Sequence, residues 1–301
     1  MERARPPRSV ASGLVVTNVA VLFFGLAGVL GTISMFPAPL ITLARVLLAT
    51  PVLAIVVFSR GLSVRPQGRS HLLILVAQGA LLAIHWTAFF QSIVVSSVAI
   101  GLLAFSSFPL FVAALEPLLL KQRPTKLQVI AALFIVPGVY LLVPAFSFGN
   151  TITAGVLWGI LAGATFALLS VVNRWLGRSY PSLVISLYQD GIATLVLLPV
   201  LLFVTPAQPV TLRTALALVM LGVVCTALAH TLFIEGMRGI SAQMASLIAS
   251  LEPVWGILFA LLLLHQVPTG RTLVGGGIIL GAALAPLVGS ILNGEMRTKP
   301  S

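Results

Sequence analysis

Lys121-Gln122-Arg123-Pro124-Thr125 returns 144 residues later as His265-Gln266-Val267-Pro268-Thr269. The same shift aligns the chain with itself without a gap and superposes apolar stretches and prolines, among them Pro37 on Pro181 and Pro109 on Pro253. The loop charges do not repeat, because the first loop carries a lysine and an arginine where the second carries a histidine and a valine. A duplicated unit whose basic loops change sides is typical of two halves that cross a membrane in opposite directions.

The composition excludes a soluble domain. Hydrophobic residues make up 59% of the chain and charged residues only 8%, and the mean hydropathy is +1.13. A helix that spans the hydrocarbon core needs about 20 mainly apolar residues. We predict ten such helices, at 12–33, 38–58, 72–94, 97–120, 127–146, 152–173, 181–204, 212–235, 241–264 and 271–291.

The net charge of +11 follows the predicted loops. Fourteen of the 17 basic residues fall on one side of the membrane if the chain begins in the cytoplasm: Arg3, Arg5, Arg8, Arg60, Arg65, Arg69, Lys121, Arg123, Lys126, Arg174, Arg178, Arg238, Arg297 and Lys299. Cytoplasmic loops of membrane proteins are enriched in lysine and arginine. We therefore expect a multi-pass protein with both termini in the cytoplasm, and no nucleic-acid partner.

The duplication predicts two halves, residues 1–148 and 149–301, with five spans each. Because five is odd, the second half enters the membrane from the opposite face. The expected fold class is an all-α membrane protein of ten transmembrane helices in two inverted five-helix repeats. Two such halves can rock against each other and open a central cavity to either side.

Two prolines occupy equivalent positions in the middle of predicted spans. Pro109 lies in the fourth span and Pro253 in the ninth. A proline inside a helix removes a backbone hydrogen bond and tends to kink the helix. We expect this pair to act as hinges, or else only to shape the bundle.

Ionisable side chains deep in a membrane are costly and mark candidate functional sites. Four fall inside predicted spans: Arg45, His85, Asp190 and Glu252. Glu252 precedes Pro253, so it is a candidate to bind a proton or a substrate ammonium group. The alternative is a buried ion pair with Arg45 that fixes the fold. Asp190 presents the same ambiguity.

Polar and aromatic residues predict a ligand cavity. Gln78, His85 and Phe89 share one face of the third predicted helix, and Phe105 and Phe108 lie in the fourth. Trp158 and Tyr188 are candidate contributors from the second half. The alternative interpretation is that these side chains only pack between helices or face lipid.

Motifs for other chemistry are missing from the sequence. It contains no P-loop, no His-Glu-x-x-His and no cysteine cluster, since Cys225 is its single cysteine. We therefore expect no direct coupling to ATP, no metal site and no cofactor. A membrane enzyme has no support in these residues.

The chain resembles the EamA-type members of the drug/metabolite transporter superfamily over residues 12–291. The duplication, the prolines in the fourth and ninth spans, and the two Pro-Thr turns carry the resemblance. The family usually has Gly-Glu before such a turn, where this chain has Lys121-Gln122 and His265-Gln266. With His85-Trp86 and Phe105-Ser106-Ser107-Phe108-Pro109, the chain looks most like bacterial exporters of aromatic amino acids. The resemblance implies a helical basket around a central substrate cavity.

These observations predict a secondary transporter in the bacterial inner membrane. It would work as a monomer and export aromatic or other bulky neutral amino acids by alternating access, driven by the substrate gradient or by protons. The alternative is an exporter of the same fold for a broader range of metabolites or drugs. A lipid-modifying or other membrane enzyme is the remaining class.

Overall fold

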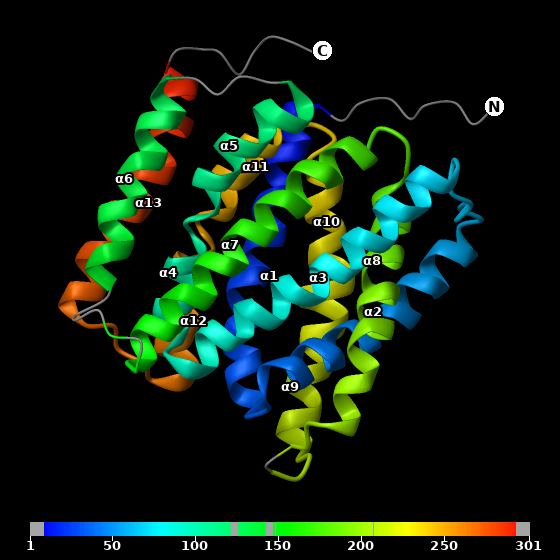
Figure 1. Cartoon of the computed structure of the whole chain (residues 1–301), viewed down its shortest axis with the longest axis horizontal. Coiled ribbons are helices and arrows are strands. Elements are labelled where there is room, and N and C mark those ends of the chain that lie inside the picture. Colours follow the sequence, from blue (N-terminus) through cyan, green and yellow to red (C-terminus); the bar gives the residue numbers. More distant parts are fainter. Residues whose placement is uncertain (1–8, 122–125, 143–146, 148, 207, 293–301) are drawn as a thin grey trace.

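The computed structural model describes residues 9–121, 126–142, 147, 149–206 and 208–292 (Figure 1). Their regular structure is helical throughout. The first half contains α1 (Val10–Ser34), α2 (Ala38–Ser59), α3 (Arg69–Val95), α4 (Val98–Phe105), α5 (Phe108–Leu120) and α6 (Lys126–Leu142). The second half contains α7 (Thr151–Leu176), α8 (Ser182–Leu197), the 3₁₀ turn η1 (Leu198–Leu202), α9 (Leu212–Gly222), the π-helical segment η2 (Val223–Leu228), α10 (Ala229–Gly236), α11 (Ala242–Ala249), α12 (Glu252–Leu264) and α13 (Gly270–Leu292).

Some predictions fall outside the described residues. These are the predicted boundary between residues 148 and 149 and the basic residues Arg3, Arg5, Arg8, Arg123, Arg297 and Lys299. The structure therefore does not test them.

Eight helical segments of the described residues are long and apolar enough to cross a membrane. They correspond to eight of the ten predicted spans, so the chain is a multi-pass membrane protein. The other two predictions, 127–146 and 271–291, fall on α6 and α13, which pack against each other at one edge of the molecule (Figure 1). Ten membrane crossings remain a prediction.

The fourth and ninth predicted spans are each broken into two helices. The break between α4 and α5 lies at Ser106 and Ser107, and the break between α11 and α12 lies at Ser250 and Leu251. The helices on either side of the two breaks begin and end 144 residues apart. Pro109 and Pro253 stand in the first turn of the following helix, where a missing backbone N–H costs nothing. A hinge at these breaks remains a prediction.

Matching caps explain why the broken helices begin at equivalent residues. The Ser97 hydroxyl accepts a hydrogen bond from the backbone N–H of Ile100 at the start of α4, at 3.3 Å. Ser241 does the same for Met244 at the start of α11, at 3.0 Å. Such caps satisfy N–H groups that have no partner within the helix. The 144-residue repeat is thus kept in local structure as well as in sequence.

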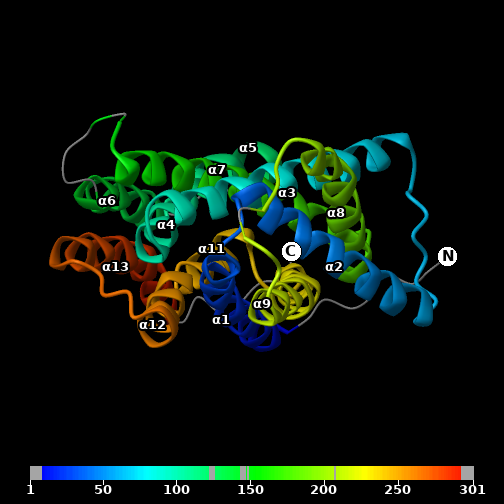
Figure 2. The same ribbon diagram turned by 90° about the horizontal axis from the view of Figure 1, so that it is seen from below.

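The two halves pack through exchanged contacts. α7 packs against α3 and α5, while α1 packs against α10 and α12, which are the repeat counterparts of α3 and α5. Figure 2 shows α3 and α7 along one side of the molecule and α1 and α9 along the other. The same helix contacts therefore recur with the two halves exchanged, as inverted repeats would require. The direction in which each half crosses a bilayer remains a prediction.

Equivalent close contacts join the halves near the ends of α3 and α10. Near the end of α3, the Ser92 hydroxyl donates a 2.5 Å hydrogen bond to the carbonyl of Gly155 on α7. Near the end of α10, a side chain at Gly13 would lie 3.0 Å from the carbonyl of Gly236, which is the repeat counterpart of Ser92. Close approach of this kind requires small residues at helix contacts in membranes.

Candidate substrate site

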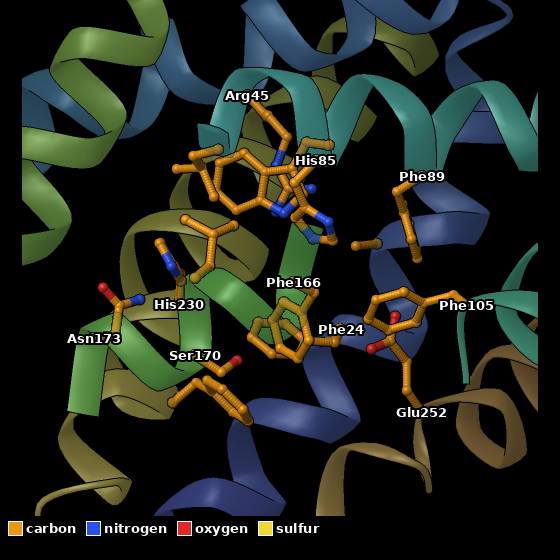
Figure 3. Close-up of a pocket in the computed structure, with 15 residues that line it drawn as sticks. Phe24, Arg45, His85, Phe89, Phe105, Phe166, Ser170, Asn173, His230 and Glu252 are labelled. Atoms are coloured by element: carbon orange, nitrogen blue, oxygen red, sulfur yellow. The ribbon is translucent and has the colours of Figure 1, made fainter. Parts of the chain in front are cut away.

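A narrow pocket with a cavity volume of about 30 Å³ lies between the halves. Fifteen residues from α1, α2, α3, α4, α7, α10 and α12 line it (Figure 3). Glycines on α7 bring the α4–α5 break close, since a Cβ at Gly159 would lie 2.6 Å from the Cβ of Ala104. Side chains from both halves thereby meet in one buried space.

Arg45 enters this pocket from α2 and is 2% exposed. Its Nε donates a 2.9 Å hydrogen bond to the hydroxyl of Thr226, and its Nη2 donates a 3.4 Å hydrogen bond to the carbonyl of Cys225. The guanidinium carbon lies 3.6 Å from the centre of the Trp86 ring, a cation–π contact. Hydrogen bonds therefore hold one edge of the Arg45 guanidinium, and the Trp86 ring covers one of its faces.

The π-helical segment η2 supplies both acceptors for Arg45. The Thr226 hydroxyl donates to the carbonyl of Leu221, five residues earlier, at 2.7 Å and accepts from Arg45. π-Helical turns inside α-helices are frequent at functional sites because they redirect backbone groups. This segment orients the arginine.

Glu252 faces the same pocket from the first turn of α12 and is 3% exposed. The structure gives it no hydrogen bond or ion pair with another described residue. The hydrogen bonds of Arg45 go to Thr226 and Cys225 rather than to a carboxylate. The ion pair that was the alternative interpretation of Glu252 is not formed in this conformation.

Asp190 lies in α8, fully buried and outside the pocket lining. Neither carboxyl oxygen has a hydrogen-bond partner among the described residues. Burial of a carboxyl group without a hydrogen-bond partner is costly, so Asp190 requires a partner that this conformation does not supply. Asp190 remains a candidate for holding a proton.

His85 stands at the centre of the aromatic part of the pocket. Its Nδ1 lies 3.0 Å from the carbonyl oxygen of Ala162 and 3.3 Å from the hydroxyl of Thr165. Because a carbonyl can only accept, we assign the proton to Nδ1, which leaves Nε2 as an acceptor. The ring packs against Phe166 at 5.2 Å and against Phe105 at 5.8 Å between centroids.

Phe105 joins the remaining rings into one cluster. Its centroid lies 5.4 Å from that of Phe89, 5.3 Å from that of Phe166 and 5.0 Å from that of Phe108. Phe89, Phe105 and Phe166 line the pocket, whereas Phe108 stacks behind Phe105 without lining it. The three predicted phenylalanines, Phe89, Phe105 and Phe108, thus lie together in one cluster of rings.

Three other predicted residues lie outside the pocket. Gln78 accepts a 3.3 Å hydrogen bond from Nε2 of Gln189. The Tyr188 hydroxyl donates to the carbonyl of Val64 at 2.6 Å, and Trp158 is 39% exposed. Their predicted contact with substrate gains no support from this conformation.

Several lining residues were not predicted as candidates from the sequence, namely Phe24, Trp86, Phe166, Ser170, Asn173, His230 and Phe233. Phe166 follows the α7 glycines on the same helical face, which is a signal that could have revealed it. His230 also lines this pocket. Its ring is buried against Trp86, with centroids 5.2 Å apart.

No group of three or more histidine, cysteine, aspartate or glutamate side chains that could hold a metal occurs in the described part of the chain. The pocket instead combines an aromatic wall with isolated polar groups of opposite charge. Such a combination suits a small organic molecule with a polar end.

Known proteins resemble the chain in sequence and in fold. The pseudopaline exporter CntI of Pseudomonas aeruginosa is 28% identical over 258 residues, which are 83% of this chain and 86% of CntI. The uncharacterized transporter YwfM of Bacillus subtilis strain 168 is 25% identical over 200 residues, 66% of this chain and 68% of YwfM. One solved protein structure superposes with a TM-score of 0.72 at 21% identity, covering 96% of this chain and 99% of the other.

The EamA-like transporter family matches the chain twice, over residues 11–143 and 153–286. The two matches fall in the two predicted halves and together cover most of the chain. Members of this family and the relatives above are transporters rather than enzymes. The chain belongs to the EamA-like transporter family.

Proposed function

We propose that the protein exports aromatic or other bulky neutral amino acids across the bacterial inner membrane by alternating access. The observation that carries the proposal is the buried pocket between the halves, where rings surround the isolated polar groups of Arg45, His85 and Glu252. Stacked or edge-on aromatic contacts favour an aromatic or bulky apolar side chain. The charged groups favour a polar end on the same molecule.

The matched contacts between the halves support alternating access. In this proposal the contacts at Ser92 and at Gly236 separate in turn, one on each side of the pocket. The breaks beside Phe108 and Glu252 lie next to the pocket, so rotation there would move lining residues directly. Broken helices at the centre of a membrane are typical of transporter binding sites.

Export as the direction of transport rests on the relative described as a pseudopaline exporter. That relative also favours the second candidate, an exporter of other metabolites with the same fold. The energy source would be the substrate gradient or protons held by Asp190, Glu252 or His85.

Transport by the purified protein in liposomes tests the proposal. We expect saturable phenylalanine flux that falls at least tenfold in Phe105→Trp, because the larger ring would fill the pocket. Trp158→Ala is the matched control, since this exposed aromatic side chain lies outside the pocket. Unchanged flux in both Phe105→Trp and His85→Ala would show that the pocket is not the substrate site.

A pH gradient separates the two energy sources. Proton coupling predicts uphill movement of amino acid when the gradient is imposed, and loss of that movement when it is collapsed. If uphill movement never occurs, the protein works by facilitated diffusion.

A further inference from the structure

The pocket contains one cationic and one anionic side chain that do not neutralise each other. Arg45 comes from α2 and Glu252 from α12, and Figure 3 shows them on opposite sides of the group of rings. We propose that they form a head-group clamp: Arg45 binds the substrate carboxylate and Glu252 binds its ammonium group. This inference rests on the proposed function and specifies how that site recognises amino acids.

Arg45 has donors to spare. An arginine side chain offers five N–H donors, and the two hydrogen bonds to Thr226 and Cys225 engage only Nε and Nη2. Both acceptors are uncharged, so the positive charge has no bonded counter-ion among the described residues. A buried charge of this kind is strongly stabilised by an anion that arrives with hydrogen-bond acceptors. A carboxylate matches the planar donor geometry of a guanidinium.

Glu252 is placed to bind the ammonium group of the substrate. Its carboxylate is nine-tenths buried or more, faces the pocket and has no hydrogen bond to another described residue. A substrate ammonium group supplies three N–H donors and the opposite charge. Asp190 cannot take this role in the present conformation, because it lies outside the pocket lining.

The two halves differ at the positions of the clamp, which selects one orientation of the bound substrate. The repeat counterparts of Arg45 and Glu252 are Gln189 and Phe108, which are uncharged. The Gln189 amide already donates to Asn173 at 2.6 Å and to Gln78 at 3.3 Å. A symmetric pocket would accept a substrate in two equivalent orientations, whereas charges in only one copy of each position select a single orientation.

Binding of three related ligands tests the clamp: phenylalanine, phenylethylamine, which lacks the carboxylate, and 3-phenylpropionate, which lacks the ammonium group. Thermal shift and calorimetry measure their affinity for the detergent-purified protein. We expect the wild-type protein to bind phenylalanine about tenfold or more tightly than either analogue, since charge-assisted hydrogen bonds are lost. Equal affinity for phenylalanine and phenylethylamine would overturn the proposal without any variant.

Two variants show which end of the ligand each charged side chain binds. Arg45→Gln should weaken the binding of phenylalanine about tenfold or more, while the affinity for phenylethylamine stays unchanged. Glu252→Gln should weaken the binding of phenylalanine by a similar factor, while the affinity for 3-phenylpropionate stays unchanged. Glu116→Gln is the matched control, because Glu116 is a buried carboxylate outside the pocket and should alter none of the three affinities. If Arg45→Gln weakens phenylethylamine as much as phenylalanine, Arg45 is structural and the clamp is wrong.

A second ligand series separates this inference from the proposed function. Leucine and isoamylamine differ in the same way as phenylalanine and phenylethylamine, without an aromatic ring. If only the aliphatic pair binds and Arg45→Gln removes the preference for leucine, the clamp is supported and the aromatic substrate is wrong. If phenylalanine is transported but Arg45→Gln keeps its preference over phenylethylamine, the function stands and the clamp is overturned.

Discussion

Thr50 and Thr194 lie 144 residues apart in the sequence and share a hydrogen bond, with their hydroxyl oxygens 3.2 Å apart. Each is the repeat counterpart of the other, so inverted repeats, as we propose them, would place their two-fold axis between these residues, where α2 packs against α8. When the two halves exchange conformations, a contact between counterparts is mapped onto itself. The contact between Thr50 and Thr194 should therefore persist whichever side of the protein is open.

Crosslinking tests this property of the axis. We expect the double variant Thr50→Cys/Thr194→Cys to form a disulfide under oxidation and to keep transport within about twofold of its reduced form. Gel mobility reports the crosslink and liposome flux reports activity before and after reduction. Loss of transport that reductant restores would show that α2 and α8 separate during the cycle.

The paired helix caps predict equal effects in the two halves. Ser97→Ala and Ser241→Ala each remove a hydroxyl that accepts from the first turn of a broken helix. Each should lower stability by about 1 kcal/mol, measured by thermal or chemical unfolding in detergent. A cost in one half with none in the other would contradict the structural equivalence of the two breaks.

The hydrogen bond from Arg45 to Thr226 can be removed by a substitution that hardly changes the shape of the threonine side chain. Thr226→Val leaves Nε of Arg45 without its acceptor, so we expect a loss of about 1–3 kcal/mol in stability and weaker binding of carboxylate ligands. Calorimetry with phenylalanine and phenylethylamine distinguishes the two effects. Thr42→Val is the control, because its buried hydroxyl donates to the carbonyl of Ala38 in the same helix and lies outside the pocket lining. Unchanged phenylalanine affinity in Thr226→Val would contradict an orienting role for η2.

The aromatic cluster predicts a stability cost as well as a functional one. Phe105 is 2% exposed and contacts rings from α3 and α7. Phe105→Ala should destabilise the protein by about 3–5 kcal/mol, whereas Trp158→Ala should stay within about 0.5 kcal/mol. Thermal unfolding in detergent measures both. A similar small effect at both positions would contradict a packed ring cluster.

Much of the fold follows from local sequence. The 144-residue shift predicted where mid-span prolines and loops would recur, because prolines and apolar runs act on their immediate neighbours. It predicted continuous spans at 97–120 and 241–264, whereas each is divided into two helices. Even the left-handed residue that ends α5 recurs at the end of α12, with φ of 58° at Lys121 and 55° at His265. These features depend on a few adjacent residues and can be predicted without knowing the packing.

The site was predictable only in part, because it depends on which face of each helix turns inward. The sequence predicted His85, Phe89, Phe105, Arg45 and Glu252 as candidates, and all five line the pocket. Their roles in binding or coupling remain predictions. Trp158 precedes Gly159, so on a helix of 3.6 residues per turn it points about 100° away from the glycine face that packs inward. The π-helical segment around Thr226 has no sequence signal comparable to a proline or a cap.

Counterflow of labelled phenylalanine into liposomes loaded with unlabelled phenylalanine tests transport through the pocket, because counterflow requires a substrate site that opens to both sides. We predict time-dependent accumulation by the wild-type protein and by Trp158→Ala, and accumulation at least tenfold lower in Phe105→Trp. Equal accumulation by Phe105→Trp and the wild-type protein would contradict the pocket between the halves as the substrate site.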